Sequence, residues 1–110
     1  MRIQNKLNGT IPSSINTLAS LNFLDLSNNN LVGTLPSSLV QLPLLKEMYL
    51  NSNKISGTIP FNLDSLASLE ILFLYSNHLS GTIPKAILNM SPLTLIDVSL
   101  NQMNGSLPAG

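Results

Sequence analysis

The sequence predicts an α/β repeat solenoid, right-handed, with a parallel β-sheet on its concave face and short 3₁₀ turns on its convex face. The first observation is that Asn, Gly and Pro recur in one register every 24 residues, and a fixed period of this length is typical of solenoids. The second is that seven apolar columns recur in the same register. The asparagines are Asn5, Asn29, Asn53, Asn77 and Asn101, followed in phase by Gly9, Gly33, Gly57, Gly81 and Gly105. Such an array presents an extended surface that suits binding a partner.

Each repeat begins with a short strand. In the run from Glu70 to Leu74, side chains two positions apart point to the same face, so Leu72 and Leu74 face the core. Ile71 and Phe73 then face solvent. The same alternation predicts parallel strands near residues 22–26, 46–50, 70–74 and 94–98.

An asparagine follows each strand, where the chain turns away from the sheet. Backbone groups at such a turn have no partner in the ladder, and an inward amide can bond them. Polar recognition is the functional alternative, but a buried polar column at a fixed period favours a structural role. The structural asparagines are Asn29, Asn53, Asn77 and Asn101.

The rest of each repeat predicts a corner and a short turn. Gly gives the backbone freedom at the corner, and Pro fixes the bend that follows. The segments 36–42 and 84–90 place apolar residues three apart, which suits short 3₁₀ turns.

The 110 residues, 44% of them hydrophobic, predict one domain with a continuous core, spanning 1–110. It divides into a partial repeat 1–17, repeats 18–41, 42–65 and 66–89, and a partial last repeat 90–110. Neither end carries the polar capping unit of a solenoid. Arg2 also falls in the column of Leu26 and Leu50, where a core residue is expected. We therefore expect a fragment without caps.

Composition excludes several classes of partner. Charged residues make up 9% of the chain and the net charge is zero, so no long-range attraction to nucleic acid or to an anionic membrane is expected. No apolar run approaches the roughly 20 residues of a membrane span, and the first residues lack the apolar stretch of a signal peptide. The absence of cysteine gives no evidence for either redox compartment.

The stretch Ser56-Gly57-Thr58-Ile59-Pro60, with its four counterparts, completes the pattern LxxLxxLxLxxNxLxGxIPxxL. Over residues 5–108 this pattern resembles the leucine-rich repeat family, specifically its plant-type subclass. The missing cysteines depart from the paired-cysteine caps of extracellular members.

The resemblance implies a piece of the ectodomain of a plant receptor-like kinase or receptor-like protein, used in signalling or defence. It implies a peptide or protein ligand, a co-receptor as a further partner, and a place outside the cell or on its surface as part of a longer protein. It also fits a soluble inhibitor of a secreted enzyme, similar to polygalacturonase-inhibiting proteins. The flanking gene sequence would separate the two: a membrane span and kinase indicate the receptor, and cysteine caps with an early stop indicate the inhibitor.

The sequence offers no catalytic constellation, and we expect neither an enzyme nor a cofactor or metal site. His78 directly follows Asn77 and has no cysteine to share a zinc ion with. Asp25 and Asp97 share a column, but at about 4.8 Å per strand they lie roughly 14 Å apart. That is too far for two carboxylates acting on one bond.

The solvent side of the strands carries an apolar patch with an acidic border. The patch comprises Tyr49, Ile71, Phe73, Tyr75 and Leu95, and the border comprises Asp25, Glu47 and Asp97. Exposed apolar patches with polar rims are where partners dock. Two alternatives remain: these side chains cover one another as ordinary cross-strand pairs, or other repeats of a longer protein hold the ligand.

Three sequons predict N-glycosylation at Asn8, Asn89 and Asn104. The motif is weak, and an Asn-rich repeat generates it by chance. Asn8 and Asn104 occupy the same position of the repeat, so both should be accessible or neither.

Overall fold

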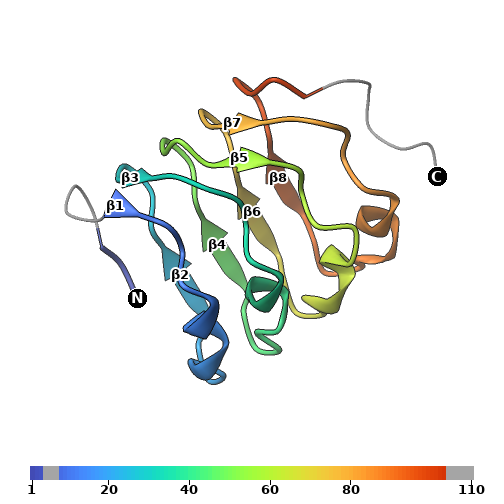
Figure 1. Cartoon of the computed structure of the whole chain (residues 1–110). Helices are drawn as coiled ribbons and strands as arrows, with labels where there is room; N and C mark the ends of the chain where they lie inside the picture. The colour runs from blue at the N-terminus through green and yellow to red at the C-terminus, as the bar shows by residue number, and fades with distance from the viewer. Residues whose placement is uncertain (4–7, 104–110) are drawn as a thin grey trace.

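The computed structural model is a parallel solenoid that describes residues 1–3 and 8–103 (Figure 1). Its main sheet has four strands in the order β2-β4-β6-β8. They are β2 (Phe23–Asp25), β4 (Glu47–Tyr49), β6 (Ile71–Phe73) and β8 (Leu95–Asp97). All are parallel, and residues 24 positions apart pair, as Leu24 pairs with Met48. The four predicted strands are confirmed, each one residue shorter at both ends.

Each coil continues through a second short strand to a 3₁₀ helix. β1 (Asn8–Gly9) pairs with β3 (Asn30–Leu31), and β5 (Ser56–Gly57) pairs with β7 (His78–Leu79). The predicted 3₁₀ turns are η1 (Ser13–Thr17), η2 (Ser37–Val40), η3 (Leu63–Ser65) and η4 (Lys85–Asn89), each in contact with the next (Figure 1). Proline in extended conformation directly precedes η1, η2 and η4. Phe61 and Asn62 intervene before η3, which is therefore shorter.

The core is built from repeated apolar columns between the sheet and the 3₁₀ helices. Leu24, Met48 and Leu72 are stacked neighbours in the sheet, and each is almost fully buried. Other buried columns are Leu26, Leu50 and Leu74; Leu31, Ile55 and Leu79; Leu42, Leu66 and Met90; and Leu45 and Leu69. Each repeat thus buries its apolar face against its neighbours.

A buried asparagine amide joins consecutive repeats at the end of each strand. The Asn53 Nδ2 donates to the Leu50 carbonyl of its own repeat at 3.1 Å and to the Leu26 carbonyl of the preceding repeat at 3.0 Å. Its Oδ1 accepts from the Leu31 N–H at 3.1 Å. Asn77 and Asn101 repeat this arrangement, and Asn29 donates to the carbonyls of Ile3 and Leu26.

A second inter-repeat contact lies at the glycine corner. Gly57 has a φ of 80°, in the left-handed region that favours glycine. A Cβ added there would lie 2.8 Å from Cγ2 of Thr34, and one added at Gly81 would lie 3.0 Å from Cγ2 of Thr58. The threonine methyl of one repeat therefore packs on the bare glycine of the next.

The expectation that Arg2 lies in the core is wrong. Arg2 pairs with Asp25 rather than with Leu26, so the first repeat is displaced by one residue against the second. Because side chains alternate between faces, a slip of one residue turns each of them over. Arg2 thus lies on the outward face with its side chain 61% exposed, and Ile3 packs against the core instead. From Asn8 onward the first repeat follows the others, because Asn8 pairs with Asn30 at the same 22-residue separation as Ser56 with His78.

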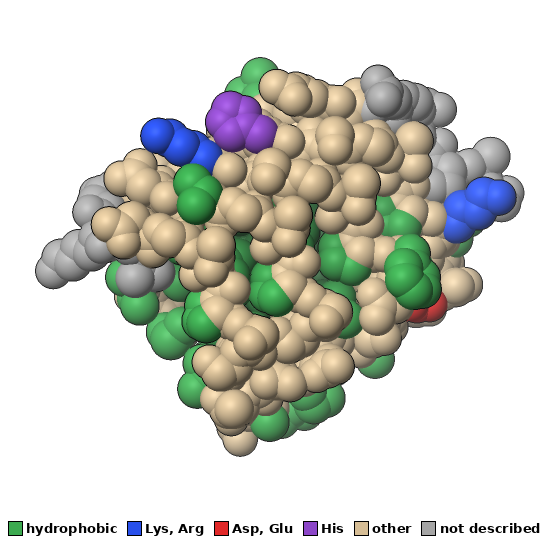
Figure 2. Space-filling model, viewed as in Figure 1, with side chains coloured by type: hydrophobic (Ala, Val, Ile, Leu, Met, Phe, Trp, Pro, Cys, Tyr) green, Lys and Arg blue, Asp and Glu red, His purple; other side chains and the backbone are tan. Residues whose placement is uncertain are grey.

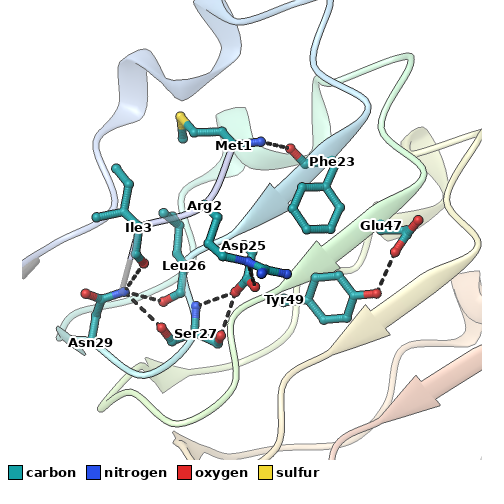
Figure 3. Close-up of polar contacts among 10 residues, drawn as sticks. All are labelled: Met1, Arg2, Ile3, Phe23, Asp25, Leu26, Ser27, Asn29, Glu47 and Tyr49. Atoms are coloured by element: carbon teal, nitrogen blue, oxygen red, sulfur yellow. Dashed lines mark hydrogen bonds and ion pairs between the residues drawn. The ribbon is translucent and has the colours of Figure 1, made fainter. Parts of the chain in front are cut away.

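Asp25 anchors this displaced segment, as Figure 3 shows. Its Oδ1 accepts from the N–H of Ser27 at 3.0 Å and from the Ser27 hydroxyl at 2.5 Å, and its Oδ2 accepts from Arg2 Nε at 2.9 Å. Burial raises the pKa of Asp25, but the hydrogen bonds from Ser27 and Arg2 and the Arg2 charge outweigh it. The pKa therefore lies below its ordinary value of 3.8. Asp25 is buried, so the expectation that it borders an accessible patch is also wrong.

We expect Asn53→Leu to lower the free energy of unfolding by about 1–3 kcal/mol, because backbone groups of two repeats lose their buried partner. Urea denaturation measures this change. Asn30→Leu, at an exposed position of β3, is the control and should have little effect. Equal stability of the Asn53 variant and the native chain would mean that water satisfies those groups.

We expect Asp25→Ala to cost about 1–3 kcal/mol near neutral pH, because two Ser27 donors lose their acceptor. A carboxylate whose folded-state pKa is lowered contributes stability above its unfolded-state pKa and loses it as the pH falls through the folded-state value. The stability gap between native chain and variant should therefore narrow below the ordinary pKa of 3.8. Urea denaturation across this pH range, with exposed Asp64→Ala as control, tests it. If the difference in unfolding free energy does not change with pH, the charge of Asp25 is not what stabilises the fold.

Candidate binding surface

The outward face of the main sheet brings together most of the predicted site residues. Alternation along each strand leaves two outward positions, and the parallel register aligns them into two rows. The rows are Phe23, Glu47, Ile71 and Leu95, and Asp25, Tyr49, Phe73 and Asp97. Tyr75, two residues beyond Phe73, extends the face toward the turn.

Four rings on this face form a continuous aromatic chain: Phe23, Tyr49, Phe73 and Tyr75. Neighbouring ring centroids are 5.6, 5.2 and 5.6 Å apart. The Tyr49 and Phe73 rings meet edge to face at 80°, a preferred arrangement of aromatic pairs. The sequence-predicted patch omitted Phe23, although Phe23 shares a row with Glu47 and Ile71, and this shared column is the signal that could have identified it.

The acidic border interacts with the aromatic chain. The Tyr49 hydroxyl donates to Glu47 Oε1 at 2.6 Å. This hydrogen bond, together with burial and the Glu47 charge, raises the pKa of Tyr49 to about 12. The Tyr49 hydroxyl therefore stays protonated at neutral pH, and its orientation is fixed toward Glu47.

Asp97 lies at the opposite end of the face from Asp25. Its Oδ1 accepts from the N–H of Ser99 at 3.0 Å and from the Ser99 hydroxyl at 2.6 Å. These two bonds outweigh partial burial and hold the pKa of Asp97 below its ordinary value of 3.8. Asp97 is thus a carboxylate at neutral pH.

Two exposed apolar residues lie on either side of Asp97 in the sequence. Leu95 is 47% exposed and Leu100 is 75% exposed. Leu100 also has a φ of 56°, at the position where Asn28, Ser52 and Ser76 adopt the same left-handed conformation. Leucine is unfavourable there, by roughly 1–2 kcal/mol. Leu95 and Leu100 thus add exposed apolar surface at the Asp97 end of the outward face.

Asn51 adds an unpaired polar atom. It lies two residues beyond Tyr49 and is buried, and its Oδ1 has no hydrogen-bond partner among the described residues. A buried acceptor without a partner costs about 1–3 kcal/mol.

The remaining sequence-predicted sites lie elsewhere. Asn8 is exposed in β1, and Asn89 is exposed at the end of η4, with its Nδ2 3.5 Å from Asp64 Oδ2. Asn104 lies outside the described residues, so glycosylation at all three stays a prediction. The side of the molecule in view in Figure 2 carries mainly uncharged side chains. Within residues 1–3 and 8–103, no group of His, Asp or Glu could hold a metal ion. None of the helices in this part of the chain is long and apolar enough to cross a membrane.

Several solved structures are similar to this chain. The ectodomain of the Arabidopsis thaliana receptor kinase GASSHO1/SCHENGEN3, in complex with CASPARIAN STRIP INTEGRITY FACTOR 2, is 42% identical, with a TM-score of 0.87 over 91% of this chain and 12% of that one. The plant peptide hormone receptor RGFR1, in complex with RGF2, is 39% identical, with a TM-score of 0.88 over 91% of this chain and 16% of that one. The BIR3–SERK2 complex from Arabidopsis thaliana is 35% identical, with a TM-score of 0.94 over 99% of this chain and 59% of that one.

This chain therefore spans only a small part of the first two receptor ectodomains. Comparison with curated protein sequences gives no match. The family model for the Leucine Rich Repeat matches residues 20–42, 44–66 and 68–90. The resemblance to plant receptor ectodomains built from this repeat is confirmed, and the chain belongs to the leucine-rich repeat family.

Proposed function

We propose that this chain is a ligand-binding segment of a plant receptor-like ectodomain, and that a peptide or protein lies against the outward face of the main sheet. The observation that carries the proposal is the aromatic chain, continued by the exposed Leu95. Repeat packing requires only the inward columns, so nothing in the solenoid demands four rings in contact on the solvent side.

The chemistry of this face suits an extended partner. Rigid rings offer a large contact area at a low cost in conformational entropy, and aromatic side chains are enriched among binding hot spots. Glu47 and Asp97 form a polar rim beside the rings. Two similar structures are receptors in complex with CASPARIAN STRIP INTEGRITY FACTOR 2 and with RGF2, which supports a peptide as the ligand class.

The finer assignments rest on the same similarity. We place the chain on the outer side of the plasma membrane as part of a longer protein, and we include a co-receptor among its partners. The similarity to the BIR3–SERK2 complex supports the second point, because that structure joins two different proteins.

Adjacent residues on opposite faces of β6 should separate folding from binding. Leu72 is 1% exposed, so Leu72→Ala should cost about 2–5 kcal/mol by opening a core cavity. Phe73 is half-buried, so Phe73→Ala should cost less than Leu72→Ala: it loses part of its buried area and the ring contacts with Tyr49 and Tyr75, about 0.5–1.5 kcal/mol each. Urea denaturation measures both. If both variants lose the same stability, Phe73 belongs to the packing.

Binding itself is tested by panning a displayed library of random peptides against the chain. Peptides that are enriched should bind Phe73→Ala at least about 2 kcal/mol more weakly, as expected for the loss of a central aromatic anchor. Phe61→Ala is the matched control, because Phe61 is 85% exposed and lies outside the main sheet. Failure to enrich any peptide that distinguishes the two variants would refute binding at this face.

A further inference from the structure

Two repeats carry the same acid–serine arrangement on the outward face. Asp25-Leu26-Ser27 and Asp97-Val98-Ser99 occupy equivalent positions, whereas the repeats between them have Tyr49 and Phe73 in place of the acid. In both, the serine N–H and hydroxyl bond Oδ1, at 3.0 and 2.5 Å for Asp25 and at 3.0 and 2.6 Å for Asp97. Each carboxylate is thus held in the same way, with Oδ2 left for another partner.

The first arrangement is occupied from within the chain. Arg2 lies beside Asp25 in the preceding repeat, and its Nε donates to Oδ2 at 2.9 Å. The guanidinium carbon lies 5.6 Å from the centroid of the Phe23 ring, within range of a cation–π contact (Figure 3). An acid–serine pair next to an aromatic ring therefore forms an arginine site in this protein.

The second arrangement has no such occupant. Phe73 holds the register position next to Asp97 that Arg2 holds next to Asp25. No cation pairs with Asp97 within the described residues, where Arg2–Asp25 is the only salt bridge. The residue equivalent to Phe23, two positions before the acid, is Leu95, and the aromatic neighbour of Asp97 is instead Phe73 on the adjoining strand. A guanidinium can bond a carboxylate and stack on a ring, so Phe73 and Asp97 together suit an arginine from outside the described part of the chain.

We infer that Asp97, held by Ser99 and flanked by Phe73, receives an arginine side chain of the ligand. This inference rests on the proposed function and names a chemical feature of the peptide: an arginine next to apolar residues that cover Phe73 and Leu95. Arginine fits better than lysine, because its planar guanidinium can bond a carboxylate and stack on a ring at the same time.

The first experiment compares two peptides by NMR titration of the ¹⁵N-labelled chain. The probe is acetyl-Leu-Arg-Leu-amide, and its control replaces arginine with citrulline, which has the same shape without the charge. The arginine peptide should shift the Ser99 amide signal and bind about fivefold more tightly or better. Asp97→Asn should abolish this preference, and Asp64→Asn, on the exposed part of η3, should preserve it.

Equal affinity for both peptides, or a preference that survives Asp97→Asn, overturns the arginine site and leaves the proposed binding face standing. A Ser99 signal that neither peptide shifts also overturns the arginine site, and the peptide panning then decides independently whether the face binds anything.

A second experiment needs no ligand. Phe73→Arg places a guanidinium at the register position that Arg2 holds, and should melt at a higher temperature than the neutral variant Phe73→Leu. The difference in melting temperature between the two variants should vanish when each substitution is combined with Asp97→Asn. Equal melting temperatures with Asp97 intact would mean that this acid–serine pair does not accept a guanidinium.

Discussion

Each repeat leaves its strand through a turn whose backbone groups have no partner in the sheet, and one asparagine amide supplies those partners. The strands are only three residues long, so their ladder bonds alone give few contacts between neighbouring coils. Asn53 adds bonds to both the preceding repeat and its own. This doubly bonded amide fixes the register of one coil on the next, and the register in turn aligns the outward rows in which the rings meet.

The regular features were predictable because they follow from two periods. Alternation along a strand assigns Leu72 and Phe73 to opposite faces, and the 24-residue repeat assigns Asn29 and Asn53 to one column. The departure at Arg2 depends on a balance between two costs that the period does not reveal. Periodicity places Arg2 inward, but desolvating a guanidinium in the core costs more than displacing one short segment.

The candidate surface was predictable in outline and incomplete in detail. The alternation of inward and outward positions in the sequence identifies Tyr49, Phe73 and Tyr75, since each lies at an outward position. It could not show that Asp25 is covered, because the covering group comes from the displaced segment. The column that Leu100 shares with Asn28, Ser52 and Ser76 predicts its exposure, but not the left-handed backbone that all four adopt.

The packing of a threonine methyl on the glycine of the next repeat has a mechanical consequence. At 2.8 Å from where a Cβ would stand, the Thr34 methyl leaves no room for the coils to come closer along that edge. Gly57 is also paired with Leu79 of the next repeat, so the same corner is held by ladder bonds and by methyl packing. Such repeated close packing favours a stiff stack, and a stiff surface costs a binding partner little entropy to order.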